Sequence, residues 1–118
     1  MLPESNQVFK ALEMSDLLGR IKPSKMDKYK QVEEFLRLLI PTLNDAIQAG
    51  HVRKPTVESP LRIVDLGCGH AYLTFGAHQY LQAAEIPVSV TGIDVRTSAR
   101  DRNNAIAASL GIEKTISF

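Results

Sequence analysis

The chain has 118 residues, of which 44% are hydrophobic and 23% charged, and its formal net charge is +1. This composition is typical of one globular domain and excludes a disordered or fibrous segment. The small net charge excludes a globally basic nucleic-acid-binding protein, so any basic patch must be local. The single cysteine, Cys68, cannot form an intramolecular disulfide, and the opening MLPESNQVFK lacks the layout of a secretion signal. No apolar run reaches the roughly 18 residues that cross a bilayer. We therefore expect a cytoplasmic protein with no membrane partner.

The first 50 residues have the periodicity of helices. Apolar residues recur at near-helical spacing from Ser5 to Ile21 and predict a first amphipathic helix. Ser24 is the expected N-cap of a second helix, with Asp27 three residues later in a variant of the capping box. Pro41 is expected to end or kink this helix, because proline lacks a backbone donor and clashes with the preceding turn. A short helical piece then ends at Gly50.

The rest of the chain alternates between strand and helix patterns. Residues 51–60 contain two prolines and no periodicity and predict a linker loop. The elements expected after it are a strand at LRIVDL, a helix over 71–84, a strand at VSVTGID, a helix over 98–110 and a strand at TISF. This order predicts an α/β fold with a Rossmann-like doubly wound sheet, truncated after about three parallel strands and preceded by a helical lead-in. The predicted division is a helical segment at 1–50, the linker at 51–60 and the N-terminal half of the Rossmann-like domain at 61–118.

A glycine-rich turn joins the first predicted strand to the helix that follows it. Glycine lets a backbone approach a ligand closely at such a turn, which indicates a nucleotide-like ligand. A dinucleotide fingerprint would need a third glycine where Tyr72 stands, so a nicotinamide-dependent oxidoreductase is the less favoured alternative. Asp65, two residues before Gly67, suits a ligand with an ammonium group, because a carboxylate attracts ammonium and repels pyrophosphate.

These residues resemble the first motif of the class I S-adenosylmethionine-dependent methyltransferases, acidic-x-Gly-x-Gly-x-Gly, with Ala71 in place of the last glycine. A second block, Thr91 to Arg96, matches the family pattern in which the acidic residue, here Asp94, accepts both ribose hydroxyls. The resemblance covers about Leu61 to Phe118. It implies a methyltransferase with S-adenosyl-L-methionine as its cofactor. The cofactor-binding residues that we predict from the two blocks are Asp65, Gly67, Cys68, Gly69, His70, Ala71, Asp94 and Val95.

A further block, Lys28-Tyr29-Lys30-Gln31-Val32, resembles a group of methyltransferase-like proteins that carry a KYKQV-type sequence before the first motif. Members of that group are described as candidate RNA methyltransferases, so the resemblance permits an RNA acceptor. The block overlaps the one local concentration of positive charge in the chain. A solvated helix face and an RNA contact are the two explanations of that charge. Its residues are Arg20, Lys22, Lys25, Lys28 and Lys30.

Several functional questions stay open at this point. The motifs that face the acceptor would follow later strands, so the catalytic residues are unknown and we expect the 118-residue chain alone to be inactive. We expect no metal site, because His70 has no Cys/His set at ligand spacing near it. A noncatalytic binding module with the same fold is a further alternative. An unpaired edge of the first strand predicts self-association through Arg62–Leu66.

Overall fold

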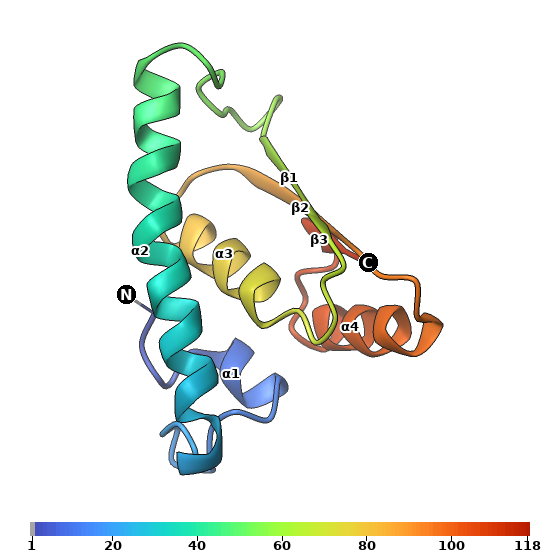
Figure 1. Ribbon diagram of the computed structural model, residues 1–118. Helices are drawn as coiled ribbons and strands as arrows, with labels where there is room; N and C mark the ends of the chain where they lie inside the picture. Colours follow the sequence, from blue (N-terminus) through green and yellow to red (C-terminus); the bar gives the residue numbers. More distant parts are fainter. Residues whose placement is uncertain (1) are drawn as a thin grey trace.

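The computed structural model describes residues 2–118 and contains a three-stranded parallel sheet with helices on one side of it (Figure 1). The predicted α/β, Rossmann-like fold with a helical N-terminus is confirmed. Within residues 2–118, no helix is both long enough and apolar enough to cross a membrane. The elements are α1 (Gln7–Ala11), the 3-10 turn η1 (Pro23–Lys25), α2 (Met26–Gln48), β1 (Leu61–Leu66), α3 (Tyr72–Ala83), β2 (Val88–Ile93), α4 (Thr97–Ser109) and β3 (Ile116–Ser117).

The sheet has the order β1-β2-β3, with all pairs parallel. Strand β1 pairs with β2 from Leu61 opposite Val88 to Leu66 opposite Ile93. Both strands are short and rich in aliphatic residues, as strands of parallel sheets are. Because the two strands run in the same direction, their carboxyl ends lie at the same end of the sheet. Asp65, near the end of β1, and Asp94, directly after β2, are both at this end.

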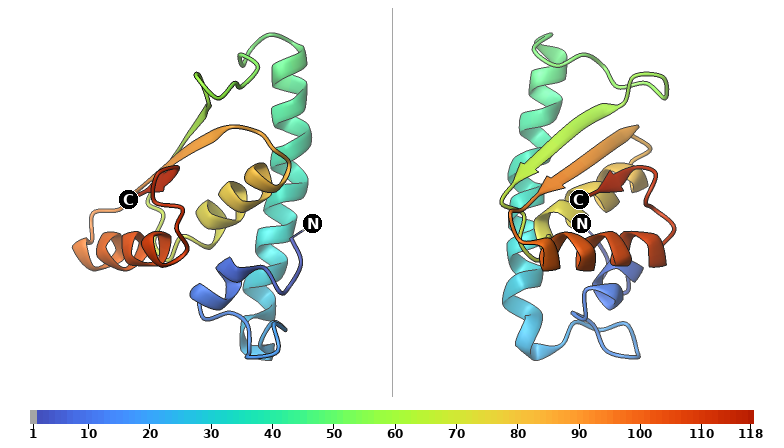
Figure 2. Two further views of the ribbon diagram at one scale, coloured as in Figure 1. Left: turned by 180° about the vertical axis from the view of Figure 1, so that it is seen from behind. Right: turned by 90° about the vertical axis from the view of Figure 1, so that its right-hand side faces the viewer.

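One face of the sheet is covered and the other is open. Helix α3 lies between the sheet and α2, as Figure 1 and the left view of Figure 2 show, and α4 packs beside β3. Alternate strand residues such as Val90 and Ile116 are buried in the core with Phe75 of α3. The side chains that point the other way are exposed, with 59% of Val64 and 76% of Leu66 accessible. The apolar outer face of β1 is therefore uncovered in this structure.

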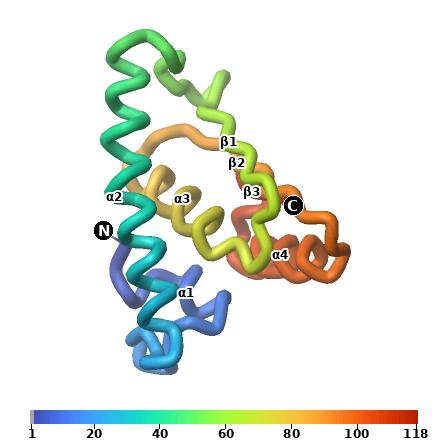
Figure 3. Tube along the Cα trace, in the orientation of Figure 1, coloured from blue at the N-terminus to red at the C-terminus, as the bar shows by residue number. Residues whose placement is uncertain are grey.

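Helix α2 packs directly on α3. A Cβ atom built on Gly76 would lie 2.6 Å from Cγ1 of Val32, so the two helices approach closer than any side chain at position 76 would allow. Val32 and Leu36 belong to the same hydrophobic core as Phe75 and Leu81. The helical lead-in and the sheet thus share one core. A loop connects the far end of α2 to β1 (Figure 3).

The predicted helix over Ser5 to Ile21 is wrong beyond Ala11, where α1 ends. The Asp16 carboxylate accepts hydrogen bonds from the backbone amides of Leu18 (2.8 Å) and Arg20 (3.0 Å). Such local side-chain bonds compete with helix formation and favour a turn. The turn brings Ser15 and Ile21 together in an antiparallel bridge. Leu17 and Leu18, which suggested a helical stripe, are exposed on this turn.

The predicted N-cap of the second helix is wrong, and Pro41 does not end that helix. Ser24 lies inside the 3-10 turn, and the N-cap of α2 is Lys25, which makes no side-chain capping bond. The helix continues through Pro41 to Gln48. Proline removes one helix hydrogen bond, but Pro41 lies on the exposed side of α2, where water can satisfy the free carbonyl. The strands and helices after residue 60 agree with the predicted ranges to within one or two residues at most of their ends.

Candidate functional site

The connection from β1 to α3 has an unusual backbone. Gly67, Gly69 and Ala71 all have positive φ angles, of 71°, 55° and 63°. The amides of Gly67 and Cys68 both donate to the carbonyl of Ile93, at 2.6 and 3.1 Å, which fastens the turn to the end of β2. A Cβ atom on Gly67 would have no other atom within 4 Å. The backbone at Gly67 is therefore open to a ligand.

Ala71 has a glycine-like conformation although it carries a methyl group. The left-handed region costs an L-residue roughly 1–2 kcal/mol. The Ala71 side chain is almost fully buried, and its carbonyl accepts the amide of Phe75 at 2.9 Å in the first turn of α3. The burial and this bond hold the strained residue in place. The turn thus has a left-handed backbone at the position where the motif that it resembles has its last glycine.

Asp94 follows β2 and connects it to the glycine turn. Its Oδ2 accepts the amide of Gly69 at 2.9 Å, and its Oδ1 accepts the amide of Arg96 at 2.9 Å. The Arg96 guanidinium adds contacts of 3.1 Å from Nε to Oδ1 and 3.4 Å from Nη2 to Oδ2. The bonds from Arg96, and then the amide of Gly69, hold the pKa of Asp94 well below its usual range. Asp94 is therefore an ionised carboxylate, with 7% of its side chain exposed.

Asp65 lies near the carboxyl end of β1, on the other side of the turn. The hydroxyl of Thr74 donates to its Oδ2 at 2.6 Å. Thr74 is buried in the first turn of α3, so its hydrogen bond fixes the orientation of the Asp65 carboxylate from the interior of the protein. Asp65 itself is half-buried and borders open space. Thr74 was not predicted from the sequence, because a threonine in the first turn of a helix gives no sign of its partner.

A hollow of about 300 Å³, which we call the turn hollow, lies over this connection. This volume is at the lower end of the range for small-molecule sites. Helix α2 contributes Lys28 and Gln31 of the KYKQV block, so that block and the glycine motif face the same space. The lining residues are Lys28, Gln31, Asp65, Gly67, Cys68, His70, Ala71, Tyr72 and Leu73. A smaller hollow of about 130 Å³ lies beyond Gly69, beside Arg96.

The structure places the side chains of Cys68, His70 and Val95 in three different environments. Burial raises the pKa of the Cys68 thiol, and the carboxylates of Asp65 and Asp94 raise it further, so the thiol is protonated at neutral pH. The exposed imidazole of His70 stacks on Tyr72, with the ring centroids 5.8 Å apart. The side chain of Val95 is 96% exposed. None of these three side chains bonds to Asp65 or Asp94 in the structure.

Asn103 of α4 is a second supporting residue that was not predicted from the sequence. It is completely buried, and its Nδ2 donates to the carbonyl of Gly69 at 2.9 Å. Its Oδ1 is buried and has no hydrogen-bond partner in the part of the chain that the structure describes. A buried amide at a helix position that packs on the turn supports the backbone of that turn. Asn103 precedes Ala107 by four positions and therefore lies on the same side of α4, the side that Ala107 buries. This spacing is the one sign in the sequence that Asn103 is buried.

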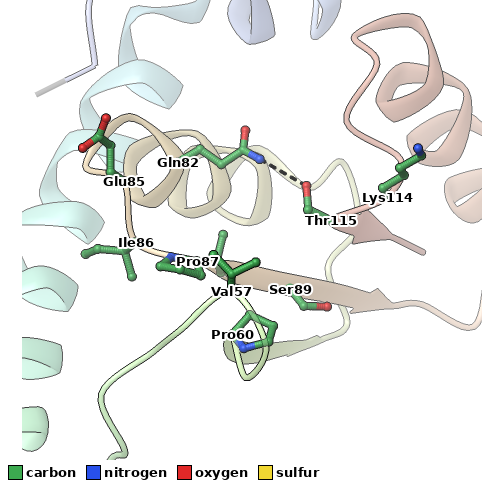
Figure 4. Close-up of a pocket in the computed structure, with 10 residues that line it drawn as sticks. Val57, Pro60, Gln82, Glu85, Ile86, Pro87, Ser89, Lys114 and Thr115 are labelled. Carbon is green, nitrogen blue, oxygen red and sulfur yellow. Dashed lines mark hydrogen bonds between the residues drawn. The ribbon is translucent and has the colours of Figure 1, made fainter.

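A larger hollow of about 580 Å³ lies at the opposite ends of the strands (Figure 4). It is lined by residues that precede or begin β2 and β3, including Pro87, Ser89 and Thr115. Ligands of open α/β sheets bind outside the carboxyl ends of the strands. The turn hollow is at that end, and the hollow in Figure 4 is at the other. We therefore assign the candidate site to the turn hollow.

The comparison with protein families agrees with the geometry. A family model described as a methyltransferase domain matches residues 27–118. The chain belongs to this methyltransferase family. The match confirms the predicted membership of the class I, S-adenosylmethionine-dependent methyltransferase family. The match begins at residue 27, near the start of α2, and therefore includes most of that helix.

Comparisons with individual proteins add less. No curated protein matches the chain. Among solved structures, the chain is similar to geranyl diphosphate C-methyltransferase from Streptomyces coelicolor A3(2), in complex with Mg²⁺, geranyl diphosphate and S-adenosyl-L-homocysteine. The sequence identity is 18% and the TM-score is 0.45. The alignment covers 98% of this chain and 46% of that chain, so this chain spans less than half of the length of its match.

Proposed function

We propose that this chain holds S-adenosylmethionine at the glycine turn and supports methyl transfer from it. The observation that carries the proposal is a pair of carboxylates at the ends of adjacent strands. Asp65 lines the turn hollow, and Asp94 accepts the amide of Gly69 in the same glycine turn. A cationic amino-acid nucleoside has an ammonium group for one carboxylate and a ribose diol for the other. The match to a methyltransferase family favours this ligand over a nicotinamide cofactor.

The proposed roles follow from the position of each group. Asp65, oriented by Thr74, accepts the ammonium group of the cofactor. The turn Gly67–Ala71, with Cys68, Gly69 and His70, contacts it mainly through the backbone, and Asp94 accepts the ribose hydroxyls with Val95 beside it. Lys28 and Gln31 border the hollow from α2 and exclude water from it. The bound cofactor supplies an already activated methyl group, so the protein mainly has to position the reactants.

For the acceptor we propose RNA. This part of the proposal is supported by the KYKQV-type block and by the basic residues that surround it. We propose that residues 61–118 form the cofactor-binding half and that the helical segment 1–50, joined by the loop 51–60, closes one side of the turn hollow. We place the protein in the cytoplasm, where its one thiol would stay reduced.

We also propose that the 118-residue chain binds the cofactor without transferring the methyl group. In a doubly wound sheet the ligand lies at the switch point, between the first strand and a neighbour on its other side. Among the strands that residues 2–118 form, β1 has a neighbour on one side only. No catalytic residue is assigned.

Titration calorimetry tests the proposal. We expect the chain to bind S-adenosylmethionine and S-adenosylhomocysteine, and to bind NAD at least about a hundredfold more weakly. The variant Asp65→Asn keeps the hydrogen bond from Thr74 but loses the charge, so it should weaken binding of both ligands about tenfold. Glu113→Gln, at an exposed position outside the turn hollow, is the matched control. A folded chain that prefers NAD, or that binds neither ligand, would refute the proposal.

A further inference from the structure

A second hollow, of about 570 Å³, adjoins the turn hollow and gathers positive charge. We call it the basic hollow. Three lysines and one arginine line it, against a single carboxylate, that of Glu13. Its lining residues are Lys10, Leu12, Glu13, Ser15, Lys22, Ser24, Lys25, His70, Tyr72 and Arg102. These four cations line one hollow of a chain whose formal net charge is only +1.

Among residues 2–118, no carboxylate forms a salt bridge with any of the four cations of the basic hollow. The salt bridges found within residues 2–118 involve Arg37 and Arg96, with Glu33, Glu34 and Asp94. Glu13 lines the hollow without approaching any of the four cations to salt-bridge distance. Like charges that converge without counter-charge repel one another, and a bound anion would relieve that repulsion. The hollow therefore suits a ligand with more than one negative charge.

The cations come from separate segments that the fold brings together. Lys10 is on α1, Lys22 and Lys25 follow the turn around Asp16, and Arg102 is on α4. The amide of Lys22 donates to the carbonyl of Met14 at 2.9 Å, which folds this segment back toward α1. A solvated helix face would carry its charges on a single helix. This convergence depends on the turn that replaced the predicted first helix, so the periodicity of the sequence did not reveal it.

The basic hollow shares a wall with the proposed cofactor site. His70 and Tyr72 line both the basic hollow and the turn hollow. Arg102 reaches this wall, since its Nη1 lies 3.3 Å from Nδ1 of His70. A ligand in the basic hollow would therefore lie next to the residues that we assign to the cofactor.

We propose that the basic hollow binds phosphate groups of the methyl acceptor and thereby positions the acceptor beside the cofactor. This inference rests on the proposed methyl transfer and names the chemistry of its second substrate. Lysine and arginine are the usual partners of phosphate in proteins, through charge-assisted hydrogen bonds. A phosphate dianion, or two adjacent phosphodiesters, matches four converging cations better than a single carboxylate does.

The test compares two triple variants with the same change of charge. Lys10→Gln, Lys22→Gln and Lys25→Gln remove charge from the basic hollow. Arg53→Gln, Lys54→Gln and Lys114→Gln remove the same charge from exposed positions outside it. Thermal unfolding establishes that both variants fold. The probes are a labelled single-stranded oligouridylate, measured by fluorescence anisotropy, and uridine 5′-phosphate with uridine as its phosphate-free control, measured by NMR.

We expect the basic-hollow variant to bind the oligonucleotide at least about tenfold more weakly than wild type at low salt. Its slope of log Kd against log salt concentration should be smaller by about two, since each phosphate contact contributes about 0.7 for a single strand. The control variant should stay within about twofold of wild type. Uridine 5′-phosphate, but not uridine, should shift the amide signals of Ser24 and His70. Tight binding of the oligonucleotide identifies a polynucleotide acceptor, and binding of the mononucleotide alone identifies a small phosphate ester.

Equal losses in the two variants, or a wild-type chain that binds neither phosphate-bearing probe, would overturn the proposal. Calorimetry with S-adenosylhomocysteine separates this outcome from a failure of the proposed function. The basic-hollow variant should bind that ligand as wild type does, because its three lysines do not line the turn hollow. If wild type binds the phosphate probes but not S-adenosylhomocysteine, the proposed function fails and the phosphate site stands.

Discussion

Arg96 occupies both carboxylate oxygens of Asp94. With the amides of Gly69 and Arg96 itself, the carboxylate has four hydrogen-bond contacts. An ionised carboxylate has about four lone-pair positions, so a ribose diol can enter only if the guanidinium leaves. The Arg96 side chain is 61% exposed and can rotate into solvent. Arg96 is therefore an internal competitor of the proposed cofactor.

Removing that competitor should strengthen cofactor binding. We predict that Arg96→Ala binds S-adenosylhomocysteine several-fold more tightly than wild type in calorimetry, because Asp94 then meets the ligand without an ion pair to break. Arg100→Ala, also on the exposed surface near the start of α4, should leave the affinity unchanged. Weaker binding by Arg96→Ala would instead mean that Arg96 contacts the cofactor.

Removing the carboxylate itself should have the opposite effect. We predict that Asp94→Ala lowers the affinity for S-adenosylhomocysteine by about tenfold to a hundredfold, the range expected for hydrogen bonds to a charged group. It also removes the acceptor of the Gly69 amide, so the turn loses one of its supports. Asp101→Ala, an exposed carboxylate on α4, is the matched control. An unchanged affinity in calorimetry would exclude Asp94 from the site.

The buried His78 predicts a loss of stability in acid. Its Nε2 lies 2.8 Å from the Thr115 hydroxyl, and its Nδ1 lies 3.2 Å from Nε2 of Gln79, so a neutral ring links α3 to the start of β3. Burial lowers the pKa of His78 from 6.5 to about 4. Between these pH values the unfolded chain binds the proton more strongly than the folded chain does. The free energy of unfolding therefore falls as the pH drops from 6.5 toward 4.

Urea unfolding measured across that range tests this prediction. Protonation of one group with such a pKa difference lowers the free energy of unfolding by roughly 2 to 3 kcal/mol. His78→Gln should lose stability overall but show a correspondingly flatter pH dependence. His51→Gln, at an exposed histidine, should keep the wild-type slope. Equal slopes for His78→Gln and wild type would contradict the assignment.

The open edge and outer face of β1 predict self-association. Among the strands formed by residues 2–118, β1 is at the edge of the sheet, and Val64 and Leu66 are exposed on it. Such an edge can pair with another chain. Light scattering should show species larger than a monomer at high concentration, and Val64→Lys should shift the population toward monomer. Leu38→Lys, at an exposed apolar position on α2, should not. A strictly monomeric wild type would refute the prediction.

The parts of the fold that the sequence predicted well are those with local signals. The aliphatic run before Gly67 predicts β1, and the acidic residue Asp94 marks the end of β2. Both predictions depend only on residues that are adjacent in the sequence. The predicted helix from Ser5 to Ile21 ends early, because the Asp16 carboxylate accepts hydrogen bonds from nearby backbone amides and these bonds compete with the helix. The periodicity of apolar residues gives no information about such bonds. Pro41 did not end α2 because its side of the helix is exposed to water.

Several of the motif residues that the sequence singles out line the turn hollow, but the residues that support them were not predicted. Thr74 orients Asp65 from nine residues away, and Asn103 holds Gly69 from 34 residues away. Such contacts exist only after α3 and α4 pack against the strand ends. The pairing of Arg96 with Asp94 is local in the sequence. The hydrogen bond from the Gly69 amide to the same carboxylate is not local, and only with it are all acceptor positions of Asp94 occupied.

The central claim is that the turn between β1 and α3, together with Asp94, binds the cofactor, and amide NMR during titration with S-adenosylhomocysteine tests it most directly. We predict that the largest shifts occur at Gly67, Gly69, Ala71 and Asp94, with little change at Gln82 and Ser89 in the hollow of Figure 4. Shifts concentrated at Gln82 and Ser89, with none at the turn, would contradict the claim.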